Sequence, residues 1–195
     1  MKNIYSQAGH PSGYIGRVLG QIMAWHNQTD NEWTLALLGI SSAENILEIG
    51  YGPGNAVQKA YMACPKCKIV GVDHSEEMLA SASRLNREAI AAGTVDLKVG
   101  NVESLDFSDG TFDKAFSINC IYFWPEPSQG LREIYRVLRV GGKLAITVRD
   151  KKREAYQKYG KENLKKMLSE AGFSRVEIQG NGVSSHPLLC GIGVK

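Results

Sequence analysis

The chain of 195 residues lacks any apolar run approaching the roughly 18–20 residues that span a bilayer. Its first residues, Met1 to Gln7, contain no hydrophobic segment of the kind a signal peptide requires, so we expect a cytoplasmic protein without stable membrane insertion. The net charge of +3 is too small for the strongly basic stripe of a dedicated nucleic-acid binder. We therefore expect no nucleic acid among its partners.

Cysteine is also scarce, and the four cysteines are too few for a disulfide framework in a chain of this size. Cys64 and Cys67 form one C-x-x-C, but a structural zinc site needs four ligands, and no second such pair is present. The pair precedes a predicted strand instead of opening a helix, which disfavours a redox role. We expect two cysteines in a loop and no metal.

The length and the amino-acid composition, with 43% hydrophobic and 22% charged residues, are typical of one soluble α/β domain. From about residue 41, short strand patterns alternate with helical ones, which predicts a doubly wound, mostly parallel seven-stranded sheet with helices on both faces. Too few residues separate the last two strands for a parallel crossover, so we expect the last strand to be antiparallel. The predicted strands are 45–50, 68–73, 94–99, 112–118, 143–148, 175–179 and 188–194.

The helical patterns of this domain have visible boundaries. One helix is predicted over 55–62, and a long one starts at Ser75 as N-cap and stops near Gly93. Another runs from 127 to 138 and is ended by Gly141 and Gly142, and a further one covers 161–171. Apolar residues at helical spacing in 1–40 predict an N-terminal helical cap, with a second short helix from Asn31, on the main domain of 41–195.

The strongest functional motif follows the first strand, where glycines alternate in Glu48-x-Gly50-x-Gly52-x-Gly54. Glycines there allow a tight turn and let a ligand approach the backbone closely. The next helix directs its free N–H groups at the same point, which is the ligand crevice of a doubly wound sheet.

The identity of the ligand depends on the glycine spacing. A dinucleotide-binding G-x-G-x-x-G starting at Gly50 would need a third glycine where Asn55 stands. Asp73, at the end of the second strand, can accept both hydroxyls of a ribose, which fits NAD and S-adenosylmethionine equally. The glycine pattern favours S-adenosylmethionine.

Four motifs together resemble the class I, Rossmann-like S-adenosylmethionine-dependent methyltransferases, especially the small-molecule branch that includes the quinone-biosynthesis enzymes. The glycine motif resembles their first motif, and the segment 70–75 around Asp73 resembles their acidic loop. The segments 100–107 and 112–142, the latter with Trp124 and a final Gly141-Gly142, resemble their later motifs. The resemblance covers about residues 45–149.

This resemblance implies roles for individual residues. Gly50, Gly52 and Gly54 would lie against the methionine and ribose, Glu48 would reach the ammonium group through water, and Asp73 would bind the ribose diol. The remaining cofactor-binding candidates are His74 and Met78 beside the adenine, Asn101 and Val102 at its edge, Glu103, Asn119 near the sulfonium, and Tyr51. Two positions depart from the family pattern, because Asp is usual at Asn101 and a small residue at Tyr51.

The acceptor side is less defined, because methyl transfer needs a general base only when the acceptor must lose a proton. His26 and Tyr122 are weak catalytic candidates. Tyr14, His26, Tyr122 and Trp124 are candidates for binding the acceptor. The resemblance implies a small-molecule substrate and a protein that is a monomer or homodimer. The apolar character of the Tyr122-Phe123-Trp124 cluster favours an aromatic or lipophilic acceptor.

Two other functions stay open at this point. One is a non-catalytic scaffold that keeps the cofactor fold, since a fold alone does not establish an activity. The other is an NAD-linked oxidoreductase, disfavoured by Asn55 and by the absence of a Tyr-x-x-x-Lys motif.

Overall fold

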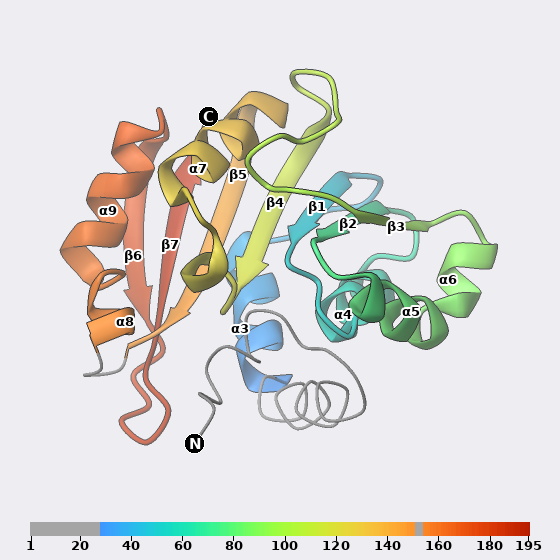
Figure 1. Ribbon diagram of the computed structural model, residues 1–195, viewed down its shortest axis with the longest axis horizontal. Helices are drawn as coiled ribbons and strands as arrows, with labels where there is room; N and C mark the ends of the chain where they lie inside the picture. The colour runs from blue at the N-terminus through green and yellow to red at the C-terminus, as the bar shows by residue number, and fades with distance from the viewer. Residues whose placement is uncertain (1–27, 151–153) are drawn as a thin grey trace.

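The computed structural model describes residues 28–150 and 154–195, which form a seven-stranded sheet between two layers of helices (Figure 1). The predicted cap helix before residue 28 lies outside the described residues. The strands are β1 (Asn45–Ile49), β2 (Lys68–Asp73), β3 (Val95–Val99), β4 (Phe112–Ile118), β5 (Leu138–Arg149), β6 (Ser174–Gly180) and β7 (Leu188–Val194). The helices are α3 (Gln28–Leu38), α4 (Asn55–Ala63), α5 (Glu76–Leu85), α6 (Arg87–Ala91), α7 (Pro127–Val137), α8 (Glu154–Gln157) and α9 (Lys161–Glu170), with a 3-10 turn η1 (Ile121–Phe123).

The strand order is β3-β2-β1-β4-β5-β7-β6, and the first five strands are parallel. β7 lies between β5 and β6 and is antiparallel to both, so the predicted doubly wound sheet with an antiparallel last strand is confirmed. The order reverses at β1 and β4, where a doubly wound sheet binds its ligand beyond the carboxyl ends of the strands.

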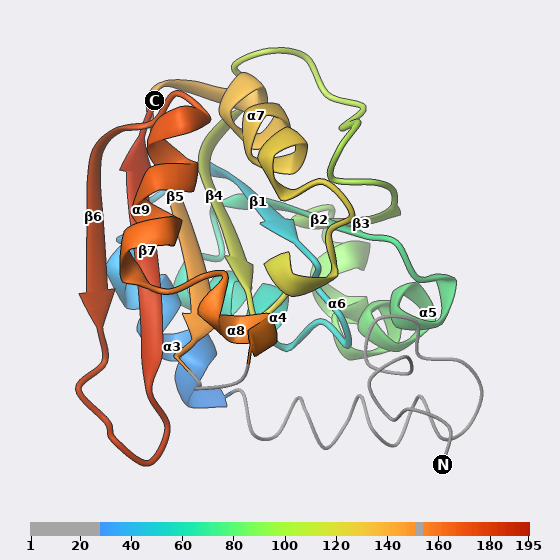
Figure 2. The ribbon, with the colours of Figure 1, turned by 60° about the vertical axis from the view of Figure 1, so that its left-hand side comes forward.

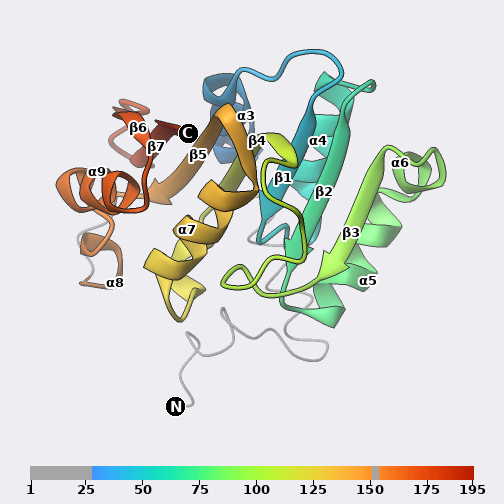
Figure 3. The same ribbon diagram turned by 90° about the horizontal axis from the view of Figure 1, so that it is seen from above.

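Two apolar clusters hold the helices against the sheet. On one face, α7 and α9 pack on side chains such as Leu47 and Ile146, and on the other α3, α4 and α5 pack on Ile46 and Phe116. Figures 2 and 3 show these two layers from the side and from above. Among the described residues, no helix has the length and apolarity to cross a membrane.

Two predicted helix boundaries are wrong. The long helix from Ser75 is interrupted at Asn86, whose amide donates to the Gly54 carbonyl at 3.1 Å and so ties the α5–α6 junction to the glycine loop. The helix starting at Pro127 ends at Val137 without a glycine stop, and Gly141 and Gly142 lie inside β5. These glycines pair with the chain end there, since the Gly141 N–H and the Gly142 carbonyl bond to Lys195.

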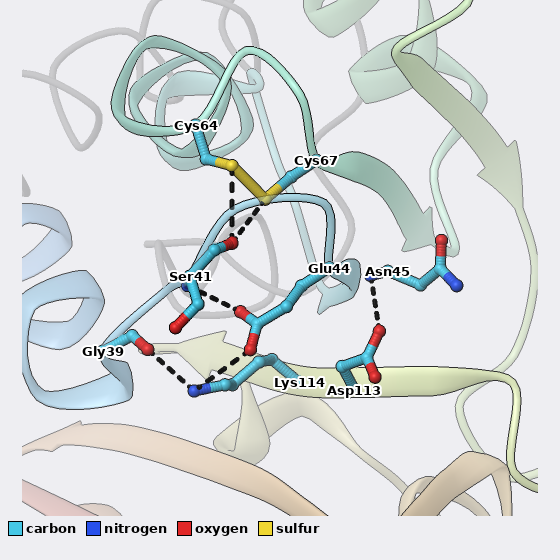
Figure 4. Close-up of a disulfide and its surroundings, with 8 residues drawn as sticks. All are labelled: Gly39, Ser41, Glu44, Asn45, Cys64, Cys67, Asp113 and Lys114. Carbon is cyan, nitrogen blue, oxygen red and sulfur yellow. Dashed lines mark hydrogen bonds and ion pairs between the residues drawn. A yellow bond between two sulfur atoms is a disulfide. The ribbon is translucent and has the colours of Figure 1, made fainter.

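Cys64 and Cys67 lie in the loop between the end of α4 and the start of β2, as expected, but they also form a disulfide that the sequence analysis did not predict (Figure 4). A turn in which the Cys67 N–H donates to the Cys64 carbonyl brings their Cα atoms to 5.4 Å. The Ser41 carbonyl oxygen lies 3.0 Å from the Cys67 sulfur, so the disulfide packs against the linker between α3 and β1. Lys114 fixes the same linker through the Gly39 carbonyl at 2.7 Å.

Candidate functional site

The loop after β1 has left-handed backbone at Gly50, Gly52 and Gly54, with φ of 75°, 50° and 89°. The three glycines serve different purposes. A Cβ on Gly50 would lie 2.1 Å from the Cys120 sulfur, and one on Gly54 would lie 2.6 Å from the Asn86 amide nitrogen. A Cβ on Gly52 would meet no atom of the described residues within 4 Å. The outer glycines are therefore required by internal packing, whereas the middle one leaves room for a ligand.

Asp73 ends β2 directly beside this loop and is only 7% exposed. Its Oδ2 accepts the Gly52 N–H at 2.9 Å, and its Oδ1 accepts the Ser75 N–H at 3.0 Å. A carboxylate oxygen can accept more than one hydrogen bond, so both oxygens keep the capacity to meet a diol. His74 is half-exposed, with its Nδ1 3.5 Å from Asp73 Oδ1.

Glu48 lies buried under the loop, and its Oε2 has no hydrogen-bond partner among the described residues. Burial, and secondly the charge of Asp73, raise the pKa of the Glu48 carboxyl to about 8. A buried carboxyl without a partner is costly, and a cationic ligand group beside it would favour its ionised form.

Tyr51 is buried, and its ring packs against Gly71 on β2, where an added Cβ would lie 2.7 Å from Tyr51 Cδ1. The hydroxyl is buried without a partner in the described chain. Burial, followed by the charge of Asp73, raises the pKa of Tyr51 above its usual range.

The candidates for the adenine edge lie around the ends of β2 and β3. Met78 is buried in the first turn of α5, where its N–H donates to the N-cap hydroxyl of Ser75 at 3.3 Å. The Asn101 side-chain oxygen accepts the Glu103 N–H at 3.0 Å, which keeps one further acceptor position on that oxygen. Glu103 Oε1 accepts the backbone N–H of Glu126 at 2.6 Å, and Val102 is 7% exposed.

Asn119 follows β4 in left-handed backbone, with φ of 53°. Its N–H donates to the Thr147 carbonyl, and its side-chain Oδ1 is buried without a partner in the described residues. Asparagine tolerates this backbone better than most residues, and strained positions of this kind concentrate at functional sites. The next residue, Cys120, is partly buried, and desolvation raises the pKa of its thiol to about 12, so it is not a thiolate nucleophile.

Of the four candidates for binding the acceptor, two belong to the described residues and two do not. Tyr14 and His26 lie outside the described residues. The Tyr122 hydroxyl accepts the Arg149 N–H, and its ring lies edge-on to Tyr156 and Tyr159. Burial raises the pKa of Tyr122. Trp124 is 7% exposed and donates its indole N–H toward the Cys120 sulfur at 3.4 Å.

Three polar residues at this edge were missed in the sequence: Asp30, Arg149 and His186. Asp30 is completely buried, and its carboxylate faces Asn119, Arg149 and His186. No motif indicates this cluster, because its members come from α3, the end of β5 and the β6–β7 loop. Only the antiparallel pairing of β7 with β5 brings His186 to this edge.

The sheet order, the glycine loop after β1 and the acidic residue ending β2 define the class I methyltransferase fold. Two solved methyltransferase structures have a similar fold. One is a SAM-dependent methyltransferase from Aquifex aeolicus, with a TM-score of 0.70 and 22% identity over 85% of this chain and 90% of that one. Another is a Haemonchus contortus phosphoethanolamine N-methyltransferase in complex with S-adenosylhomocysteine, with a TM-score of 0.73 and 20% identity over 86% of this chain and 52% of that one.

Sequence comparison shows the family. Residues 47–146 match the methyltransferase domain model, and the chain belongs to this family. It is 33% identical over 181 residues to the uncharacterized methyltransferase YdaC of Bacillus subtilis, covering 91% of this chain and 98% of that protein. It is 30% identical over 121 residues to the ubiquinone/menaquinone biosynthesis C-methyltransferase UbiE of Geobacter sp., covering 60% of this chain but only 52% of that protein.

Proposed function

We propose that this methyltransferase binds S-adenosylmethionine over the loop after β1 and transfers its methyl group to a small-molecule acceptor. The observation that carries the proposal is the pairing of Asp73 with Gly52, which holds an acidic side chain beside open space at a glycine. Family membership supports the reaction, and small-molecule methyltransferases such as UbiE are among the relatives.

The residues present fit that cofactor. Asp73 would accept the ribose hydroxyls, and Glu48 would face the ammonium group. The unpartnered oxygens of Glu48 and Asn119 are buried acceptors, and a ligand with N–H donors would satisfy such atoms. Asn101, Val102 and Met78 would border the adenine, with His74 and Glu103 at its rim and Asn119 toward the sulfonium.

The bound cofactor supplies a methyl group that is already activated on a sulfonium. The protein therefore has to align the acceptor with that methyl and exclude water. Trp124 and Tyr122 lie beyond the end of β4 and would form an apolar wall of the acceptor site. The predicted N-terminal cap of residues 1–40, with Tyr14 and His26, would complete it.

The first test is thermal unfolding with S-adenosylmethionine, S-adenosylhomocysteine and NAD in parallel. A ligand at about 100-fold over its Kd stabilises by about 2.7 kcal/mol, which raises the Tm by about 5–10 °C for a chain of this size. We expect this shift with the two sulfur nucleotides and none with NAD. A shift with NAD alone would contradict the proposal, and the absence of any shift would favour a fold without a cofactor.

A second test separates an enzyme from a binding scaffold. The protein is incubated with methyl-labelled S-adenosylmethionine and a panel of small aromatic and lipophilic acceptors, and label is followed into organic extracts. We expect label in at least one acceptor. Binding of both sulfur nucleotides without any transfer would favour the scaffold.

A further inference from the structure

Asp30 is completely buried on α3, and its carboxylate connects three other segments. Its Oδ2 accepts the Asn119 amide at 2.7 Å and lies 3.4 Å from Arg149 Nη2, while its Oδ1 lies 2.8 Å from His186 Nε2. Figures 1 and 2 show that α3 and the β6–β7 loop lie at the edge where β4 and β5 end. A charged cluster is therefore built at the carboxyl edge of the sheet.

The contacts of Asp30 determine which histidine nitrogen carries a proton. An ionised carboxylate only accepts hydrogen bonds, so the contact with Nε2 requires an Nε2–H. In a neutral imidazole the lone pair is then on Nδ1. Arg149 supplies the positive charge that balances Asp30, so His186 does not have to be charged for the cluster to be neutral. Besides these groups, the cluster borders the Tyr122 hydroxyl, which is bonded to the Arg149 backbone.

His186 is also accessible, unlike the carboxylate that holds it. Its side chain is 32% exposed, whereas that of Asp30 is fully buried. A buried carboxylate that orients a partly exposed imidazole is the arrangement by which proteins stabilise the imidazolium that forms on proton uptake.

The cluster adjoins the proposed methyl donor through Asn119 and Cys120. The Asn119 side-chain amide donates to Asp30. The next side chain, Cys120, packs directly on Gly50 in the loop after β1. The left-handed backbone of Asn119 and its unpartnered Oδ1 are independent signs of a ligand site at the same point.

We propose that His186, positioned by Asp30, is the base that takes the proton of the methyl acceptor, and that this acceptor is a hydroxyl or amine compound whose heteroatom receives the methyl group. This inference rests on the proposed function. The acceptor X–H gives its proton to Nδ1 of His186, and the electron pair left on X forms the bond to the methyl carbon. The carbon–sulfur bond breaks with its electrons on sulfur, which becomes a neutral thioether. Asp30 stays ionised and faces the imidazolium.

The state of His186 is measured directly by long-range ¹H–¹⁵N NMR of the full chain saturated with S-adenosylhomocysteine. The His186→Gln variant identifies the His186 signals, because they alone vanish. We expect a neutral ring with Nε2–H at pH 8, and a mixture of tautomers in Asp30→Asn. An imidazolium at every pH between about 6 and 9, or an Nδ1–H tautomer, would overturn the proposal by making the pair a fixed structural contact.

Turnover of two phenols gives a second readout. 4-Nitrophenol is already an anion at pH 8, whereas 4-methylphenol keeps its proton as tyrosine does. General-base catalysis contributes about 10²–10⁴-fold, so His186→Gln should slow methylation of 4-methylphenol about 100-fold or more and that of 4-nitrophenol less than about 3-fold. An equal loss on both phenols would overturn the proposal. If the wild type methylates neither phenol, the proposal is tested by the tautomer and protonation state of His186 measured by NMR.

A matched control separates the base from the packing of α3. Thr34 lies one turn after Asp30 and shares a buried hydroxyl contact of 2.6 Å with Thr147. Thr34→Val disturbs the same interface without removing a titratable group, so it should lower the Tm while keeping the NMR tautomer and the ratio between the phenols. Binding of S-adenosylhomocysteine to the wild type separates a failure of the proposed function from a failure of this inference. If the wild type does not bind the ligand, the proposed function is refuted. If it binds the ligand but His186 has another tautomer, only the inference about His186 is refuted.

Discussion

Asp73 Oδ2 accepts the backbone N–H of Gly52 at 2.9 Å, so the side chain that ends β2 fixes the loop that follows β1. The sequence indicates the ribose contact of Asp73 but not this second role. The same carboxylate also accepts the Ser75 N–H, which starts α5. One residue therefore positions both segments that would border the cofactor.

The first prediction concerns Asp73→Ala. A hydrogen bond to a charged group contributes about 1.5–3 kcal/mol, so losing even one such bond to a ribose hydroxyl should weaken S-adenosylhomocysteine binding by at least about 10- to 100-fold. Isothermal calorimetry measures the affinity. Asp96→Ala is the control, because Asp96 is an exposed aspartate on β3 and its removal should change neither affinity nor stability. An unchanged Kd in Asp73→Ala would exclude the ribose contact.

The second prediction compares Gly52→Ala with Gly93→Ala. Both glycines have left-handed backbone, with φ of 50° and 66°, and neither would place a Cβ within 4 Å of the described residues. Each substitution should therefore lower the free energy of unfolding by about 1–2 kcal/mol. Only Gly52→Ala should lose affinity for S-adenosylhomocysteine, because Gly93 lies between α6 and β3. Urea unfolding and calorimetry of the pair measure both effects, and equal affinities would contradict a ligand at Gly52.

The third prediction addresses Tyr51, whose ring packs on Gly71 and whose hydroxyl is buried without a partner in the described residues. Tyr51→Phe removes an unsatisfied polar group and keeps the ring, so stability should stay equal or rise. If the hydroxyl makes no cofactor contact, affinity for S-adenosylhomocysteine stays within about 2-fold, which is about 0.4 kcal/mol. A loss of 10-fold or more would assign the hydroxyl to the cofactor.

The parts of the fold that could be predicted are those set by local pattern. Alternating strands and helices indicate the sheet, and the short connection before β7 indicates an antiparallel strand. The long helix from Ser75 could not be divided correctly, because its break at Asn86 depends on a contact with Gly54, far away in the sequence. The Cys64–Cys67 disulfide was missed because one pair at C-x-x-C spacing is compatible with loop, redox and metal roles alike.

In the candidate site, too, the residues in local motifs could be predicted from the sequence, whereas those brought together from distant segments could not. Glu48, the three glycines and Asp73 belong to contiguous motifs, so the sequence places them together. Asp30, Arg149 and His186 carry no motif, and they meet only after α3 docks on the sheet and β7 pairs with β5. Acceptor sites assembled from such distant segments are not visible as sequence patterns.

The fourth prediction is a pH dependence caused by Glu48. Burial, with the charge of Asp73 as the second cause, raises the pKa of this carboxyl from 4.5 to about 8. Between these values the folded protein keeps a proton that the unfolded chain has lost. Without ligand, the contribution of Glu48 to the free energy of unfolding therefore falls as the pH rises from about 4.5 to 8, and it is constant above that range. The slope from this one group is about 1.4 kcal/mol per pH unit.

Glu48→Gln cannot titrate, so it isolates this effect. Urea unfolding of both proteins at pH 5, 6, 7 and 8 should show the variant gaining stability relative to the wild type at each step. A difference that does not change with pH would refute the raised pKa. Saturating S-adenosylhomocysteine adds an ammonium group that favours ionised Glu48, which lowers the pKa of the carboxyl and flattens the slope. The wild type should then bind this ligand with release of a proton at pH 7, and Glu48→Gln should bind it more weakly and without that proton, as calorimetry in buffers of different ionisation enthalpy would measure.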